Sequence, residues 1–432
     1  MWFGIAWLSA VLHKRKNKLK DDVVVIGAGI VGAACAANLV LAGKKVTIID
    51  RLLPGEGCSF GNAGGLSPSI SFPLATPDMF KHIPGWLFDP DGPLVVAWKR
   101  IPAATPWLIK FLRQGTPAKS ALAATGMRKM LRASFDDYLP LFTFAGAEQL
   151  IHKVGQLYLY STKEGFEQEK SAIEARKSLG IEQLILDSKQ LREFEPALSP
   201  MFGSGIFFPT HGHCSNPQQL VQMLIQACIQ NGAKFISGSV QRIAPLEDSV
   251  LIHTDGNSIQ TGQVVLATGV WSNELIQPLG WKAPLESQRG YHIQIAHSGV
   301  KATRNVLWSE KKTLVTPMDD GLRVAGTAEI AGLNAPPTRR RFALLRDLAQ
   351  QMYPTVNVEQ TSEWMGHRPC TPDSLPVIGP LPNNPRVICA FGHGHVGLTG
   401  ASFTGRVVRD IAMGGLDKHT HNEWTPFSIE RF

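Results

Sequence analysis

A glycine-rich corner between two apolar stretches constrains the fold more than any other feature of this sequence. Residues 23–26 (VVVI) form an unbroken apolar run, which is typical of a buried parallel strand. The segment GAGIVG at 27–32 follows, and small residues over 33–42 predict a helix. A second apolar strand at 46–49 ends at Asp50. The pattern predicts a βαβ unit, with two parallel strands joined through the helix.

The three glycines of this corner have separate expected roles. Gly27 permits a tight turn, Gly29 lets the backbone approach a pyrophosphate, and Gly32 lets the helix pack closely on the strand. The helix N-terminus carries about half a positive charge and would face the phosphates. Asp50 is placed to accept hydrogen bonds from ribose hydroxyls, and a solvated acid at a strand end is the alternative. The predicted cofactor-binding residues here are Gly27, Ala28, Gly29, Ile30, Val31, Gly32, Asp50 and Arg51.

Two further glycine-bearing segments favour FAD over NAD. Residues 59–65 (SFGNAGG) offer a hydroxyl and several backbone N–H groups, which suits a path beneath a pyrophosphate and a flavin ring, although a plain glycine loop is the alternative. Residues 392–400 (GHGHVGLTG) join a strand to a helix, where free N–H groups would stabilise negative charge on a reduced flavin. The two histidines of this loop lack a third ligand, so we predict no metal site. The other predicted cofactor contacts are Ser59, Asn62, Ala63, Gly64, Gly65, Val240, Ala267, Thr268, Gly269, Trp271, Gly392, Gly394, His395, Gly397, Leu398 and Thr399.

The net charge of +8 is concentrated near the start of the chain. Residues 14–20 hold five basic side chains, and the remainder of the chain has 38 basic and 35 acidic residues. That near balance gives no basic stripe and excludes a nucleic-acid partner. The apolar run at 1–12 is shorter than the roughly 20 residues that span a bilayer, and its charges follow it, unlike those of a secretory leader.

Two interpretations of residues 1–20 stay open. They form an extension without a role in the fold, such as one from an upstream start, or they anchor the protein to acidic lipid. We expect a cytoplasmic protein, which the second interpretation would place on the inner face of the cytoplasmic membrane. The six cysteines include no CxxC pair and are expected to be free thiols in a reducing compartment.

The rest of the chain predicts a second region beside the nucleotide-binding one. Residues 71–135 are rich in proline and tryptophan and are expected to be an insertion outside the sheet. We predict strands at 156–160, near 240, and at 264–267, 291–295, 322–325 and 387–391, and helices at 217–230, capped by Asn216, and at 338–352.

With these segments placed, the chain resembles the D-amino-acid oxidase-like superfamily of flavoproteins, and most closely the bacterial D-amino-acid dehydrogenases, including those acting on D-proline and hydroxyproline. The resemblance covers nearly everything after residue 20. It rests on the fingerprint at 27–32 with the SFGNAGG segment, on HRPCTPDSLPVIG at 367–379 and on the GHGH loop, with support from ATGVW at 267–271 and GTAE at 326–329.

The resemblance implies an α/β fold, in which a Rossmann-like FAD-binding domain with a mostly parallel sheet is interleaved with an α+β substrate domain built on an antiparallel sheet. The expected divisions are an extension at 1–20, FAD-binding parts at 21–80, 205–285 and 360–432, and substrate-domain parts at 81–204, with the insertion, and 286–359.

The resemblance also implies how a substrate binds. In glycine-oxidase relatives the arginine five residues before the aspartate of the Arg-Pro…Asp stretch clamps the substrate carboxylate, and Arg368 holds that position here. A planar guanidinium suits this role because it forms two parallel charge-assisted hydrogen bonds. An ion pair of Arg368 with Asp373, or a bond to the backbone, is the alternative. Tyr291 and His292 would line the pocket or accept the ammonium proton, unless they are ordinary strand residues. The predicted catalytic residues are Arg368, Tyr291, His292 and His395.

Two positions distinguish this chain from the sarcosine-oxidase relatives. The cysteine that bonds covalently to flavin in those enzymes corresponds to Gly366, so we expect non-covalent FAD. The lysine that activates oxygen in them corresponds to Val396, which favours a dehydrogenase over an oxidase.

The expected reaction is oxidation of the carbon–nitrogen bond of a D-amino or imino acid. By resemblance, the neutral amine gives its α-hydrogen as hydride to flavin N5, and the resulting imine yields a keto acid when the amine is primary. The electron acceptor is expected to be a quinone or the respiratory chain. Two alternatives remain: an oxidase of N-methyl, imino or glycine-type amino acids that uses O2, and a flavoprotein subunit of a larger electron-transfer complex. The sequence does not indicate an oligomeric state.

Overall fold

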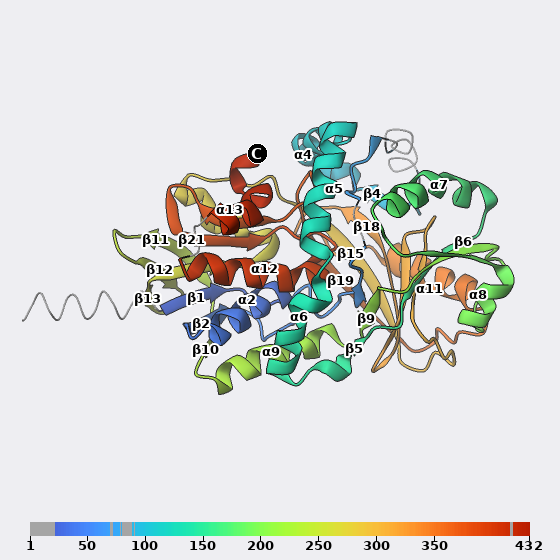
Figure 1. Cartoon of the computed structure of the whole chain (residues 1–432), viewed down its shortest axis with the longest axis horizontal. Helices are drawn as coiled ribbons and strands as arrows, with labels where there is room; N and C mark the ends of the chain where they lie inside the picture. Colours follow the sequence, from blue (N-terminus) through green and yellow to red (C-terminus); the bar gives the residue numbers. More distant parts are fainter. Residues whose placement is uncertain (1–21, 70–71, 78, 80–88, 90, 415–417) are drawn as a thin grey trace, which may run out of the picture.

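Two sheets lie side by side, and each is built from segments that are far apart in the sequence (Figure 1). The computed structural model describes residues 22–69, 72–77, 79, 89, 91–414 and 418–432. The predicted contact of residues 1–20 with lipid therefore lies outside the described residues. None of the helices in the described part of the chain is both long enough and apolar enough to cross a bilayer. All six cysteines are free, as predicted.

The first sheet is six-stranded in the described chain and is parallel except where its last two strands meet. Its order is β10 (Lys234–Ser237), β2 (Lys45–Asp50), β1 (Asp22–Ile26), β14 (Gln263–Leu266), β21 (Asn384–Phe391) and β20 (Val377–Leu381). One face is covered by α2 (Ile30–Leu41), α9 (Pro217–Gln230) and α12 (Gly397–Ala412). A small sheet of β11 (Val240–Pro245), β12 (Val250–Thr254) and β13 (Ser258–Thr261) covers the other.

Small side chains explain the position of α2 at the centre of this layer. Its residues from Ala33 to Ala37 are fully buried, because α2 packs on the sheet and also against α9 and α12. The predicted helix α9 begins as expected: Pro217 occupies its first turn, and the Asn216 side chain accepts a hydrogen bond from the Gln219 amide at 3.0 Å.

The second sheet has nine strands in the described chain and is mainly antiparallel. Its order is β19 (Thr361–Cys370), β15 (Glu286–Ile295), β18 (Gly321–Ile330), β17 (Thr313–Met318), β16 (Asn305–Trp308), β6 (Gln156–Tyr160), β8 (Ser204–Phe208) and β7 (Leu184–Asp187), with β4 (Leu94–Val96) paired to β18. Helix α11 (Arg339–Met352) packs through Phe342 and Leu345 on one face of this sheet. The predicted fold class, a Rossmann-like region interleaved with an antiparallel one, is confirmed.

Two expectations, about the insertion at 71–135 and about the division at residue 360, need correction. Residues 94–96 of the expected insertion form β4 and join the second sheet. Much of the remainder is helical, in α4 (Ile101–Gln114), α5 (Pro117–Leu131) and α6 (Ser134–Ala145). Pro102 and Pro117 lie in first helical turns, where proline lacks no needed hydrogen bond, and α4 also contains Pro106, so proline content did not exclude helices here. Strand β19 pairs with β15 of the second sheet, although it follows the expected division at 360.

The remaining helices and strands are short or lie at the periphery of the two sheets. They are β3 (Gly65–Leu66), β5 (Ile151–His152), β9 (Gly212–Cys214), α7 (Lys163–Ser178), α8 (Ser188–Phe194), α10 (Ser272–Ile276) and α13 (Lys418–Trp424).

Candidate active site

The glycine corner has the geometry that its three glycines predict. Gly27 has φ +110°, and a Cβ there would lie 2.4 Å from the Ala267 carbonyl oxygen. A Cβ on Gly32 would lie 1.8 Å from the Gly27 carbonyl oxygen, so only glycine allows α2 to approach β1 this closely. Beside Gly29 the space is open, and the nearest atom to a Cβ would be Ser59 Oγ at 3.5 Å. An open cradle at a helix N-terminus fits a phosphate group.

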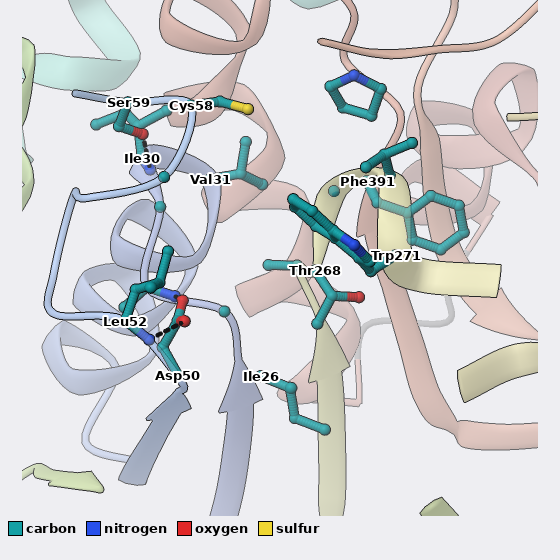
Figure 2. A pocket seen from close by; sticks show the side chains of 18 of the residues that line it. Ile26, Ile30, Val31, Asp50, Leu52, Cys58, Ser59, Thr268, Trp271 and Phe391 are labelled. Carbon is teal, nitrogen blue, oxygen red and sulfur yellow. Dashed lines mark hydrogen bonds between the residues drawn. The ribbon is translucent and has the colours of Figure 1, made fainter. Parts of the chain in front are cut away.

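Side chains from two neighbouring segments complete this corner (Figure 2). Ser59 Oγ accepts a hydrogen bond from the Ile30 amide at 2.9 Å, and helix α2 has no side-chain cap of its own. Asp50 accepts from the Ala28 amide at 2.6 Å and from the Leu52 amide at 2.9 Å, one bond to each oxygen. Each carboxylate oxygen keeps a further lone pair, so Asp50 can still accept a ribose hydroxyl.

A long cleft runs from this corner to the glycine loop after β21. The Arg51 guanidinium lies 4.5 Å from the centroid of the Trp271 ring, in a cation–π contact at the cleft wall. The predicted cofactor residues that line the cleft are Gly27, Ala28, Gly29, Ile30, Val31, Asp50, Arg51, Ser59, Asn62, Val240, Ala267, Thr268, Gly269, Trp271, Gly392, Gly394, Gly397 and Leu398.

Six predicted cofactor residues lie away from the cleft wall: Gly32, Ala63, Gly64, Gly65, His395 and Thr399. Gly64 and Gly65 face the protein, since a Cβ on Gly64 would lie 2.5 Å from the Cys214 carbonyl oxygen and Gly65 pairs with β9. The Thr399 hydroxyl lies 3.4 Å from the Gly65 carbonyl oxygen. Gly64, Gly65 and Thr399 therefore shape the cleft through packing, and the sequence pattern alone did not distinguish such residues from those that line it.

The SFGNAGG loop is held on the second sheet by side chains that the sequence analysis missed. Arg323 donates to the carbonyl oxygens of Phe60 at 3.0 Å and Asn62 at 2.7 Å, and Thr316 donates to that of Ala63 at 2.7 Å. Arg323 is a buried cation within an apolar strand. An arginine inside the apolar strand predicted at 322–325 was the sequence signal that could have indicated a functional contact. The loop is thus fixed by the sheet that faces it.

His292 belongs to this support and does not line the cleft. Its Nδ1 lies 3.1 Å from the Gly61 carbonyl oxygen, and its ring stacks on Trp364 with centroids 5.3 Å apart. Burial, helped by the Arg323 charge, lowers the pKa of His292 to about 3. A neutral imidazole bonded to the loop is poorly placed to take a proton from a substrate, so the predicted catalytic role does not fit this position.

Tyr291 points to the opposite face of the second sheet. Its hydroxyl donates to Glu329 at 2.5 Å, and its ring packs edge-on against Phe342 of α11 with centroids 5.2 Å apart. Alternate residues of a strand face opposite sides, so Gly290 and His292 face the cofactor side while Tyr291 does not. The expectation that Tyr291 lines the pocket is wrong in this structure, because it lies in the core beneath α11.

Arg368 reaches across β15 from strand β19. Its Nη1 donates to the Thr327 carbonyl oxygen at 3.1 Å. Asp373 does not pair with it, because Arg431 Nε lies 2.7 Å from Asp373 Oδ2. Within the described residues no carboxylate forms an ion pair with Arg368. Burial lowers the pKa of Arg368, but an arginine keeps its charge even so. Arg368 is therefore a cation without an anionic partner among the described residues.

The loop after β21 presents backbone and two histidines to this region. Gly392 has φ +86° and Gly394 has φ +54°, and α12 begins at Gly397 without a side-chain cap. His395 faces a small cavity beside Cys370, and its side chain is exposed. His393 lines the cofactor cleft, and its Nε2 lies 2.8 Å from Thr404 Oγ1. The described residues contain no cluster that could hold a metal ion.

The fold and the cleft together define a dinucleotide-binding oxidoreductase. The chain belongs to the DAO family of FAD dependent oxidoreductases, whose pattern it matches over residues 22–411. It is 35% identical over 418 residues to a D-amino-acid oxidase of Bradyrhizobium diazoefficiens, covering 95% of this chain and 98% of that one. It is 30% identical over 427 residues to a D-amino acid dehydrogenase of Paramagnetospirillum magneticum, covering 93% and 100%.

Solved structures with the same fold are more distant in sequence. A glycine oxidase from Bacillus cereus has a TM-score of 0.71 at 19% identity and covers 93% of this chain and 97% of its own. An L-proline dehydrogenase from P. horikoshii has a TM-score of 0.71 at 20% identity and covers 95% and 98%. The cofactor is therefore FAD, and the open cradle at Gly29, the Asp50 carboxylate and the uncapped N-terminus of α12 fit it.

Proposed function

We propose that this protein is an FAD-dependent dehydrogenase of a D-amino or imino acid, with a quinone or another acceptor that is not O2. The observation that carries this proposal is Arg368, a part-buried cation beside the cofactor cleft with no acidic partner among the described residues. A buried charge without a partner is costly, and a substrate carboxylate supplies the missing anion. Two relatives named for D-amino acids support this substrate class.

Arg368 would bind the carboxylate and fix the substrate's α-carbon beside the cofactor. When bound, FAD would supply the redox chemistry for oxidation of the carbon–nitrogen bond. The protein contributes position and charge: the guanidinium holds the acid, and the enclosing strands exclude water. We also propose that FAD is held without a covalent bond, because Gly366 supplies no thiol at the expected position. Denaturing the protein with acid should then release all of the flavin into solution.

The pH dependence of kcat/KM should follow the substrate and not the protein. Burial lowers the pKa of His292 to about 3, so its imidazole stays neutral from about pH 5 to 9. Only the neutral amine can release hydride, so kcat/KM should rise with pH up to the pKa of the substrate ammonium. Steady-state rates with D-alanine and D-proline should show inflections that differ as their ammonium pKa values do. A shared inflection near pH 6.5 would instead identify a histidine as a base.

Val396 supports an acceptor other than O2. Its side chain is 3% exposed and packs in the core beneath α12, so no cationic group occupies this position of the loop. A quinone acceptor resides in a membrane, and acidic lipid contact by residues 1–20 belongs to the same proposal. The competing candidate is an O2-using oxidase, which the 35% identity to the Bradyrhizobium enzyme favours.

Measuring both electron acceptors in parallel distinguishes these two functions. With D-proline as substrate, we expect reduction of a soluble quinone analogue to exceed oxygen consumption by at least about tenfold, a difference of about 1.4 kcal/mol in activation free energy. Oxygen consumption as fast as quinone reduction by the unaltered protein would establish the oxidase.

A further inference from the structure

Strand β18 contains one residue too many opposite Gly290. Gly290 pairs with Ala328, and the next residue, Tyr291, pairs with Gly326, so Thr327 has no partner in the ladder between β15 and β18. Thr327 has φ +52°, in the left-handed region that a β-branched residue rarely adopts. These two features identify a β-bulge with Thr327 as its extra residue.

The Thr327 side chain does not explain this conformation. Thr327 is only 4% exposed, and its hydroxyl has no hydrogen-bond partner among the described residues. A left-handed β-branched residue and a buried unpaired hydroxyl both destabilise a folded protein. Local stability therefore does not account for the bulge, and strain of this kind is concentrated at functional sites.

The bulge does provide a contact for Arg368. The Thr327 carbonyl oxygen accepts a hydrogen bond from Arg368 Nη1 at 3.1 Å. To reach it, the Arg368 side chain crosses strand β15 directly over Gly290, where an added Cβ would lie 2.4 Å from the guanidinium carbon. The guanidinium can thus occupy this position because Gly290 has no side chain and because the carbonyl oxygen of Thr327 accepts its hydrogen bond.

We propose that Thr327 and Gly290 are positioning residues for Arg368. The carbonyl of the bulge holds one edge of the guanidinium and leaves its remaining N–H groups to the substrate carboxylate, an inference that rests on the proposed role of Arg368. A carbonyl suits this task better than an acid, because it orients the guanidinium without neutralising the charge that the substrate needs. Neither residue touches the substrate in this proposal.

Deleting Thr327 is the most direct test, because it removes only the extra residue. Gly326 and Ala328 become neighbours, so every other pair between β15 and β18 is kept while the carbonyl that holds Arg368 is lost. We expect kcat/KM for D-proline to fall at least about tenfold, with most of the change in KM, while the flavin content and spectrum stay unchanged.

Gly290→Ala tests the same proposal without changing the number of residues in either strand. If the deletion variant does not fold, this variant alone tests whether Arg368 is positioned in this way. The added methyl group should displace the guanidinium and raise KM for D-proline at least about tenfold. Gly203→Ala is the matched control, because a Cβ there meets no atom within 4 Å and kcat/KM should not change. For D-prolinamide, which has no carboxylate, kcat/KM should be the same for Gly290→Ala and the unaltered protein.

Arg368→Ala, measured alongside, separates failure of the positioning role from failure of the clamp. If Arg368→Ala loses activity while Gly290→Ala and a folded Thr327 deletion change kcat/KM by less than about threefold, positioning by Thr327 and Gly290 is refuted and the clamp stands. An equal loss for D-proline and D-prolinamide in Gly290→Ala also refutes the positioning role, because it indicates general damage. If Arg368→Ala itself has no effect, both proposals fail.

Discussion

Replacing Arg368 with alanine should lower kcat/KM for the preferred D-amino acid about a hundredfold. The expected loss of transition-state binding is about 3 kcal/mol, because hydrogen bonds to charged groups contribute roughly 1.5–3 kcal/mol. The guanidinium has one protein hydrogen bond, to Thr327, and no carboxylate pairs with it among the described residues. Its removal should therefore affect substrate binding more than folding.

Two comparison variants make this result specific. Arg368→Lys keeps the charge but loses the planar fork, so its kcat/KM should lie between those of the alanine variant and the unaltered protein. Arg386→Ala removes a surface arginine that forms an ion pair with Asp248 at 3.8 Å, and it should have no kinetic effect. Steady-state kinetics that show less than about a threefold loss for Arg368→Ala would reject the clamp.

Replacing Gly29 with valine should weaken FAD binding at least about a hundredfold, or about 2.7 kcal/mol. The space beside Gly29 holds no atom nearer than Ser59 Oγ, so a valine side chain would occupy the place where the pyrophosphate approaches the backbone. The fold should persist, because no neighbouring backbone obstructs the new side chain. The variant should be isolated without flavin, and titration of the apoprotein with FAD should measure the loss.

Gly256→Val is the matched control for this variant. A Cβ at Gly256 also meets no atom within 4 Å, but Gly256 lies in the turn between β12 and β13, away from the cleft. It should therefore retain FAD fully. If Gly29→Val bound FAD as tightly as the control, the phosphate-binding role of the glycine corner would be excluded.

The glycine corner was predictable because its information is local. A buried strand, a turn that needs glycine and a helix of small residues are adjacent in the sequence, and Asp50 ends the next strand. Each of these features depends on neighbours along the chain, so the structure places them as expected. The residues 27–31 all line the cleft.

The substrate side was less predictable because it depends on strand pairing across long distances. The sequence leaves Tyr291 either in the pocket or as an ordinary strand residue, because the face of β15 that it occupies follows from the register with β18 and β19. The bulge at Thr327 could not be inferred from the sequence, since the predicted strand ended at residue 325 and the bulge is defined by the pairing of β18 with β15. Strand β19 was missed because Gly366 and Pro369 are unusual within strands. The Arg368 position came from family resemblance, not from the pattern of residues around it.

Reduction of the bound flavin without oxygen tests most directly whether this site oxidises D-amino acids. The purified protein would be mixed anaerobically with D-alanine, D-proline, the hydroxyproline epimers, their L-enantiomers and sarcosine, while the flavin absorption band is followed. We expect at least one D-amino or D-imino acid to bleach the band rapidly, and its L-enantiomer to leave it unchanged on the same timescale. A band that no D-substrate bleaches, in protein that holds its full complement of FAD, would contradict the proposed function.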